Sequence, residues 1–216
     1  GSPAQIAWRD MPYKRTPPAG ESTPGVGLAK AAYVKDKDGD YWAVGSQSGE
    51  LFFYSPDGKK LDSLQFPAAI NDIAVLDIDK DGKSELLLAC QDAYLRAIKR
   101  DGRELWNKKF EFYRLYPDVT IVKTADLNGD GEEEIIVGCD NWRTYVMDQK
   151  GKDVWNYEVV HPVRAIRIAD LDGDGKPEVI CGTRYMWATV LDNQGRKRWG
   201  SRFGVGCRAV AAPLNG

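Results

Sequence analysis

Short apolar runs separated by polar turns recur along the chain, and their lengths match those of β-strands. Each repeating unit contains four such runs, bounded by Gly, Asp, Asn or Ser. No segment sustains the periodicity of about 3.6 residues that marks an amphipathic helix. The pattern therefore predicts an all-β chain built from repeated four-stranded units.

The second and fourth runs of a unit differ in character. The second run is continuously apolar at residues 86–88, 135–137 and 179–180, which is typical of a strand covered on both faces. The fourth run alternates, as expected for an outer strand with one wet face. In three units this run carries a tryptophan four residues after a turn glycine, namely Trp106, Trp155 and Trp199. We expect these tryptophans to wedge between neighbouring sheets.

An acidic nine-residue loop precedes the second run in three units. Its positions 1, 3, 5 and 9 carry side-chain oxygens, and position 6 is glycine. Alternate side chains can then converge on a hard cation while glycine permits the sharp turn. We expect one Ca²⁺ per loop, with the position-7 carbonyl as a further ligand. The expected ligands are Asp77, Asp79, Asp81, Lys83 and Glu85; Asp126, Asn128, Asp130, Glu132 and Glu134; and Asp170, Asp172, Asp174, Lys176 and Glu178.

Other cation loops fit less well. An EF-hand requires a bidentate glutamate at position 12 and flanking helices, but position 12 is Leu88, Val137 or Cys181, with strands expected on both sides. A dockerin-type loop likewise needs a following helix. The mixed set of six or seven oxygens favours Ca²⁺ over Mg²⁺, and acidic turns without metal are the remaining alternative. The first unit, from Val34 to Trp42, lacks the first and ninth carboxylates, so we expect a turn there without tightly held metal.

The spacing of the units indicates a β-propeller. Loop starts at Val34, Asp77, Asp126, Asp170 and Pro213 are 43, 49, 44 and 43 residues apart, and a period near 43 suits a four-stranded blade. We expect four full repeats, possibly part of a larger or five-bladed ring. Their limits are about 27–66, 67–115, 116–160 and 161–204, with a partial repeat over 205–216. Residues 1–26 combine an apparent cloning scar (Gly1-Ser2), a possible edge strand at 6–8 and a Pro/Gly-rich tether.

These motifs carry a family resemblance over roughly residues 27–212. The pattern D-x-[DN]-x-D-G-x-x-E before an apolar strand resembles the FG-GAP/VCBS class of calcium-binding propeller repeats, seen in integrin α-subunits and many secreted bacterial proteins. The turns Asp148-x-x-Gly151-x-x-x-Trp155 and Asp192-x-x-Gly195-x-x-x-Trp199 resemble the docking motif of quinoprotein-like propellers. The resemblance implies a calcium-binding propeller, but propellers host many unrelated functions, so it fixes no activity.

Composition limits the classes of binding partner and the cellular locations that we expect. Of 216 residues, 43% are hydrophobic and 29% charged, with a formal net charge of -2, which does not favour a nucleic-acid partner. No apolar stretch approaches the roughly 18 residues that cross a bilayer, so we expect no membrane insertion. Calcium loops of modest affinity favour a secreted, extracellular or periplasmic protein. The four cysteines are expected as buried free thiols, with a Cys181–Cys207 disulfide as the alternative.

A ligand site is expected on the face opposite the calcium loops. On that face the loops between second and third runs, and the connections between units, differ in sequence from one unit to the next. Loops that vary in this way often carry binding residues. The candidate ligand-binding residues are Tyr113, Arg114, Tyr116, Trp142, Arg143, Arg184 and Tyr185. Aromatic and arginine side chains suit sugar rings and also protein hot spots, although blade-packing aromatics and solvated arginines would give the same composition.

The leading hypothesis is a calcium-stabilised, lectin-like binding module for a glycan or an extracellular protein, and we expect no catalytic residues. One alternative is a polysaccharide lyase-like enzyme using His161, Tyr113 and Arg114. Another is a structural propeller portion of a larger secreted protein. A homo-oligomer or a ring completed by another chain is also open. Phosphate-loop, dinucleotide, nucleophile-elbow and zinc signatures do not occur in the sequence.

Overall fold

The computed structural model describes residues 30–203, which form sixteen strands and no helix. Expected features at Trp8, in the tether and over 205–216 lie outside these residues. The first two sheets contain β1 (Lys30–Val34), β2 (Tyr41–Gly45), β3 (Glu50–Tyr54) and β4 (Lys60–Gln65), then β5 (Ile70–Leu76), β6 (Glu85–Cys90), β7 (Tyr94–Ile98) and β8 (Glu104–Lys109). The last two contain β9 (Val119–Ala125), β10 (Glu134–Cys139), β11 (Arg143–Met147) and β12 (Asp153–Glu158), then β13 (Val163–Ala169), β14 (Glu178–Thr183), β15 (Trp187–Leu191) and β16 (Lys197–Arg202).

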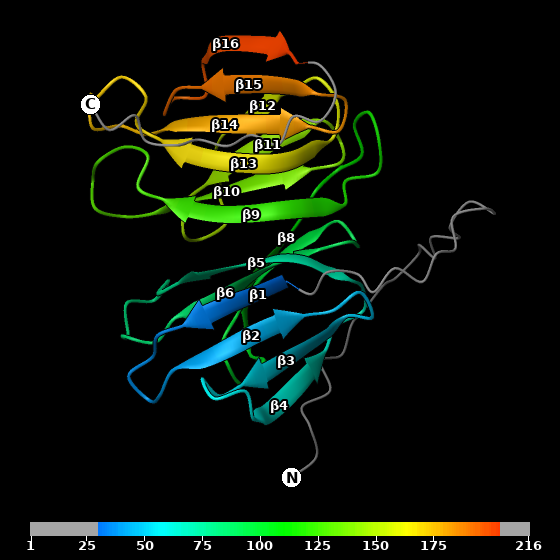
Figure 1. Cartoon of the computed structure of the whole chain (residues 1–216), viewed down its shortest axis with the longest axis vertical. Coiled ribbons are helices and arrows are strands. Elements are labelled where there is room, and N and C mark those ends of the chain that lie inside the picture. The colour runs from blue at the N-terminus through cyan, green and yellow to red at the C-terminus, as the bar shows by residue number, and fades with distance from the viewer. Residues whose placement is uncertain (1–29, 204–216) are drawn as a thin grey trace, which may run out of the picture.

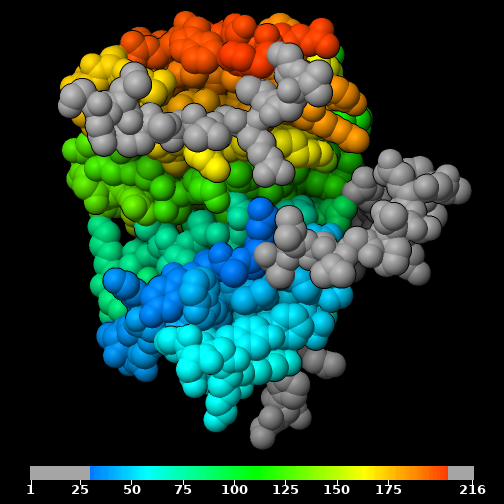
Figure 2. Space-filling model, in the orientation of Figure 1, coloured from blue at the N-terminus to red at the C-terminus, as the bar shows by residue number. Residues whose placement is uncertain are grey.

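Each sheet is a four-stranded antiparallel meander in chain order, which is the blade of a β-propeller. The first strands of successive blades pack on one another, β1 on β5, β5 on β9 and β9 on β13. Figure 1 shows the blades following one another along the long axis, with β4 and β16 at opposite ends. In Figure 2 the blades form successive bands of colour along the same axis. The expected all-β propeller of four-stranded blades is confirmed.

Three hydrophobic clusters fill the spaces between the four blades. The first joins β2 and β3 to β6, the second joins β6 and β7 to β10, and the third joins β10 and β11 to β14. A blade with neighbours on both sides must bury both faces of its second strand. Every residue of β6 is accordingly buried, whereas β2 in the first blade alternates between buried and accessible positions.

The cysteines belong to this core. Cys90, Cys139 and Cys181 are buried free thiols, in line with one of the two expectations. Burial in apolar surroundings raises the pKa of the Cys90 and Cys181 thiols to about 12. They are therefore protonated packing residues at neutral pH. Cys207 lies outside the described residues.

Candidate calcium loops and ligand-binding surface

The three acidic loops share one hydrogen-bond frame, and each connects the first two strands of a blade. The position-9 glutamate accepts a bond of 2.8 Å from the position-2 amide in all three, from Ile78, Leu127 and Leu171. The position-1 aspartate accepts from the amide of the position-6 glycine at 3.0, 2.8 and 2.9 Å. These bonds fold each loop inward, so side-chain oxygens far apart in the sequence meet.

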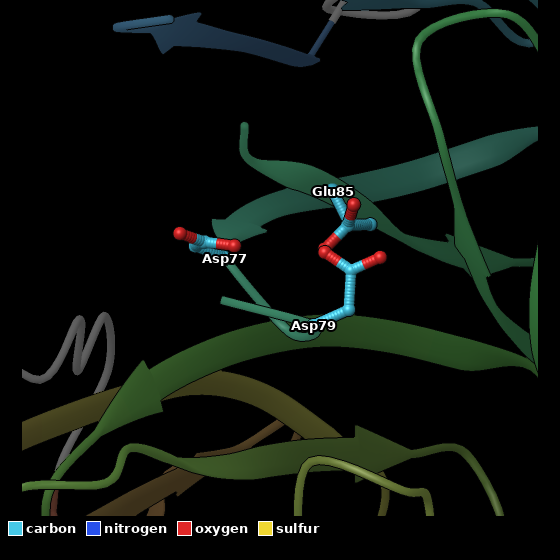
Figure 3. Close-up of side chains that lie close together, drawn as sticks. All are labelled: Asp77, Asp79 and Glu85. Atoms are coloured by element: carbon cyan, nitrogen blue, oxygen red, sulfur yellow. The ribbon is translucent and has the colours of Figure 1, made fainter. Parts of the chain in front are cut away.

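The loop between β5 and β6 brings three carboxylates together. One oxygen from each of Asp77, Asp79 and Glu85 lies within 4.8 Å of the others (Figure 3). Glu85 is buried, and its burial raises the pKa of its carboxyl above the usual range. Oδ1 of Asp77 is also buried and has no hydrogen-bond partner among the described residues. An uncompensated buried oxygen is unfavourable, and a cation would satisfy it.

A lysine side chain supplies positive charge to this loop. Nζ of Lys99, at the end of β7, lies 2.7 Å from Asp79, 3.0 Å from Asp81 and 3.3 Å from Glu85. Its hydrogen bonds to Asp79 and Asp81 raise the pKa of Lys99, and its bond to Asp81 lowers the pKa of that carboxyl. Lys99 therefore neutralises part of the charge that a bound divalent ion would neutralise.

The loop between β13 and β14 has the same arrangement with a different cation. Asp170, Asp172 and Glu178 form a second cluster of carboxylate oxygens within 4.8 Å. Nη1 of Arg198, on β16, donates to Asp172 at 2.5 Å and to Glu178 at 2.9 Å. The bond to Arg198 lowers the pKa of the Asp172 carboxyl.

In the middle loop, between β9 and β10, no lysine or arginine of the described residues pairs with Asp126, Asp130 or Glu134. The amide of Asn128 donates to Glu134 at 2.8 Å instead. Asp148 stands where the second blade has Lys99, and Val154 stands where the fourth has Arg198. Burial raises the pKa of Glu134. The middle loop thus offers a cation its oxygens without a competing lysine or arginine among the described residues.

The donor sets of all three loops fit Ca²⁺, which takes six to eight oxygen ligands in flexible geometry. Position-1, -3, -5 and -9 side chains would hold the ion; the three position-7 carbonyls remain predicted ligands. The first-blade loop is different. Its Asp38 pairs with Lys83, and the Lys37 ammonium donates to the Asp81 carbonyl. The first-blade loop is therefore a turn that packs against the second-blade loop.

The opposite face carries a cluster of three aromatic rings. Trp142, between β10 and β11, lies edge-to-face against His161 with centroids 4.7 Å apart, and His161 lies in the same way against Tyr185, also at 4.7 Å. The guanidinium of Arg184 lies 5.9 Å from the Tyr185 ring. Rings from the third and fourth blades therefore meet across their connection.

A second group of side chains adjoins this ring cluster through Arg114. Its guanidinium lies 5.7 Å from the Trp142 ring and 5.2 Å from the Tyr113 ring, and Arg143 covers Tyr113 at 4.3 Å. Glu158 accepts from the Tyr113 hydroxyl at 2.7 Å and pairs with Arg114 at 3.2 Å. Tyr113 and Arg114 lower the pKa of this carboxyl. We call the joined groups the aromatic–arginine surface: Tyr113, Arg114, Trp142, Arg143, Glu158, His161, Arg184 and Tyr185.

Six of the seven ligand-binding residues expected from the sequence thus lie in one connected surface. The seventh, Tyr116, is half-buried on the same connection between β8 and β9 and stays a prediction. Sequence reasoning missed Glu158. Its only signal was a carboxylate at the end of an otherwise alternating outer strand, beside the connection that holds His161.

An open pocket of about 400 Å³ lies at this surface, lined by Trp142, Tyr157, Glu158, Val159 and Val160. Trp142 and His161 both adopt left-handed backbone conformations, with φ of 70° and 82°. The equivalent turn position has a positive φ in every blade, at Gly49, Ala93, Trp142 and Met186, so at Trp142 this conformation belongs to the blade turn. Indole Nε1 of Trp142 and Nδ1 of His161 are buried without hydrogen-bond partners among residues 30–203. The left-handed backbone of His161 and the unmatched polar atoms of both side chains are features of ligand sites.

Comparisons with known proteins agree with this architecture. Residues 126–181, from the middle acidic loop to the fourth-blade strand β14, match the model of the FG-GAP-like repeat. The chain is thus a β-propeller that contains an FG-GAP-like repeat, called the FG-GAP-type propeller below. The match begins at Asp126, the first residue of the middle acidic loop, and ends at Cys181, within the strand that follows the last acidic loop. No curated protein matches this FG-GAP-type propeller.

Solved structures share its fold at low sequence identity. BBS1N, crystallised in complex with ARL6DN and soaked with lead, gives a TM-score of 0.60 at 13% identity, covering 81% of this chain and 52% of that one. The Vibrio cholerae biofilm matrix protein Bap1 gives 0.59 at 23%, covering 81% and 28%. The Neurospora crassa Pan2 WD40 domain gives 0.58 at 14%, covering 83% and 52%. The FG-GAP-type propeller therefore spans about half or less of these chains.

No helix among residues 30–203 has the length and apolarity needed to cross a bilayer.

Proposed function

We propose that this FG-GAP-type propeller is a secreted, calcium-stabilised binding module that takes a glycan on the aromatic–arginine surface. The observation that carries the proposal is the pair Trp142 and His161. Their rings meet edge-to-face at the pocket, the backbone of His161 is left-handed, and each ring has a nitrogen without a partner among the described residues. A sugar ring offers C–H faces to aromatic rings and hydroxyls to such nitrogens.

The size and chemistry of the pocket support a sugar ligand. A volume of about 400 Å³ lies within the range of small-molecule sites. Its lining combines the indole of Trp142 and the ring of Tyr157 with the carboxylate of Glu158, so apolar stacking and hydrogen bonding are available side by side. Arg114 pairs with Glu158, so this carboxylate does not make the pocket anionic.

A glycan array probed with the full chain in about millimolar Ca²⁺ tests this proposal. We expect selective binding that Trp142→Ala weakens at least tenfold, since hot-spot aromatics contribute about 2 kcal/mol or more. Phe112→Ala is the matched control, because Phe112 is an exposed aromatic on the neighbouring connection and outside the surface. Absence of binding to any glycan, or equal loss in both variants, would contradict the site.

A protein ligand is the second candidate. It is favoured by one specific observation, that the BBS1N structure of the same fold is a complex with the protein ARL6DN. The lyase alternative has less support, because Tyr113 and Arg114 both bind Glu158. Growth of the ultraviolet absorbance of an unsaturated uronate on incubation with uronate polymers would replace the binding proposal with that enzyme.

The calcium part of the proposal has its own test. Without metal, clustered carboxylates repel one another within a few Å, and an ion that binds only the folded chain stabilises it by mass action. At ten times the Kd this amounts to about 1.4 kcal/mol per site. We expect the Tm to fall in EDTA and to recover with Ca²⁺, and to recover less with Mg²⁺. A Tm that EDTA leaves unchanged would exclude a stabilising ion.

A further inference from the structure

The blades are joined by a repeated contact between an outer-strand tryptophan and the next blade's turn. Indole Nε1 of Trp106 donates to the Gln149 carbonyl at 2.9 Å, and that of Trp155 donates to the Asn193 carbonyl at 3.0 Å. Each acceptor lies two residues before a turn glycine. A Cβ on Gly195 would come within 2.6 Å of the Trp155 ring, so the ring occupies the space that only glycine leaves free.

The fourth blade carries the same tryptophan, for which residues 30–203 supply no matching turn. Trp199 pairs with Val190 as Trp155 pairs with Val146, so the two tryptophans occupy the same register. Trp155 is packed in the third hydrophobic cluster, whereas Trp199 is 48% exposed. The expectation that all three tryptophans wedge between blades therefore fails for Trp199 within residues 30–203.

The first blade carries the turn, against which no tryptophan of the described residues packs. Gly58 has φ of 87°, and its amide donates to the Ser55 carbonyl at 2.9 Å, as Gly195 donates to Asp192 at 2.9 Å. The turn is therefore already in the receiving conformation. No described residue lies within 4 Å of the position of a Cβ on Gly58. The carbonyl two residues earlier, equivalent to that of Asn193, belongs to Pro56.

The sheet face beside this turn is apolar and exposed. Tyr33 and Trp42 are each 39% exposed, with ring centroids 4.9 Å apart. By strand pairing they match Val75 and Leu86 of the second blade. Leu86 is fully buried, and Val75 packs on the cluster between the first two blades. The first blade thus presents the surface that the second blade uses to receive a preceding blade.

We propose that two copies of this chain join head to tail, with Trp199 of each copy docked on the Gly58 turn and the Tyr33–Trp42 face of the other. Indole Nε1 of Trp199 then donates to the Pro56 carbonyl of the second copy. Both halves of the contact are present on every chain, and β4 and β16 lie at opposite ends of the blade series (Figure 1). A second copy of the chain can cover both Trp199 and the Tyr33–Trp42 face through the same contact, made twice.

More than four blades suit this fold. The four blades cover 52% of the BBS1N chain and 52% of the Pan2 WD40 chain, so single chains of the same fold are about twice as long as the part that these four blades match. Two copies related by a two-fold axis form two identical joints, so both halves of the contact are used on each chain. Two sets of these four blades joined in this way make eight blades, within the usual range of four to about eight for a propeller.

Sedimentation velocity of the full chain across the micromolar range tests the proposal. We expect a species of twice the 24.1 kDa chain mass. Trp199→Ala removes one half of the contact and Trp42→Glu the other, so each should raise the dimer Kd by about tenfold or more. Phe112→Ala, an exposed aromatic elsewhere, should change nothing. Both test residues are exposed, and circular dichroism melts of the variants establish that they fold.

Mixing the two variants distinguishes this joint from other dimers. Trp199→Ala keeps an intact receiving face, and Trp42→Glu keeps an intact tryptophan, so a mixture can form one normal joint and should regain dimer. A symmetric dimer through one face would not be rescued in this way. A monomer at all concentrations, a dimer indifferent to both variants, or failure of the mixture to associate would each overturn the proposal.

Discussion

The ammonium of Lys99 lies 2.7 Å from the Asp79 carboxylate, inside a loop whose other ligands also suit Ca²⁺. Lys99 and a divalent ion would compete for the same oxygens. The three acidic loops therefore differ in the positive charge that competes with Ca²⁺, although their sequences are nearly identical. The competing side chain comes from outside the loop.

Replacing Lys99 with methionine should strengthen Ca²⁺ binding at the Asp77 loop by about tenfold, since a like charge is removed from the site. Without Ca²⁺ the same variant should melt at a lower temperature, because three carboxylates lose their counter-ion. Isothermal titration and thermal melts measure the two effects. Lys109→Met, an exposed lysine at the end of β8, is the control; equal effects in both variants would rule out competition by Lys99.

The stabilisation by Ca²⁺ should disappear in acid. Burial raises the folded-state pKa of Glu85 and Glu134 above the ordinary carboxyl range. For a raised pKa, the folded metal-free chain gains stability below the unfolded-state value and loses it as pH rises through the folded-state value. Ca²⁺ binds the ionised form, so its effect has the opposite sign.

We therefore expect the difference in Tm with and without Ca²⁺ to narrow as pH falls from 7 into the range where the two glutamates take up protons. Melts in matched buffers across that range measure it. Glu85→Gln removes one of the two groups and should reduce both the calcium effect and its pH dependence. A calcium effect independent of pH down to the acid transition would contradict the assignment of these ligands.

Gly195→Ala should destabilise the chain far more than Gly58→Ala. Both glycines have positive φ, 78° and 87°, so both substitutions carry the backbone penalty of about 1–2 kcal/mol. Only at Gly195 does the new Cβ meet a ring, that of Trp155 at 2.6 Å. Overpacking adds about 1–3 kcal/mol. Urea unfolding of both variants under monomeric conditions isolates the contribution of the ring contact, and equal losses would refute it.

Trp142→Gly should separate folding from binding. Glycine adopts φ near 70° without penalty, as Gly49 does at the equivalent position. The loss of the ring contact with His161 is then offset in part, and we expect the free energy of unfolding to change by no more than about 1 kcal/mol. Glycan binding should be lost. Retained binding by a stably folded variant would remove Trp142 from the site.

Local patterns were sufficient to predict the blades and their loops. The continuous apolar run of β6 and the spacing of Asp77, Asp79 and Glu85 are set within a few residues, so the sequence displays them directly. The six connected members of the aromatic–arginine surface followed from topology, because alternate loops of a meander lie at the same end of the blades.

Contacts between distant strands could not be read in this way. Lys99 and Arg198 enter their loops from other strands, and their orientation depends on sheet register. Glu158 lacked a motif, and its role appears only when Tyr113 and Arg114 are placed beside it. Trp199 has the same local sequence pattern as Trp155. The two differ because the turn at Gly195 packs against Trp155, whereas Trp199 is exposed.

The alternation of β2 has a consequence for motion within a single chain. Its amides belong to a blade backed on one side, whereas β6 and β10 are sandwiched on both. Opening the first blade disrupts one interblade cluster, while opening the second disrupts two. Hydrogen–deuterium exchange in the isolated chain should therefore proceed from β2 inward, with the amide protons of β6 and β10 the last to be replaced.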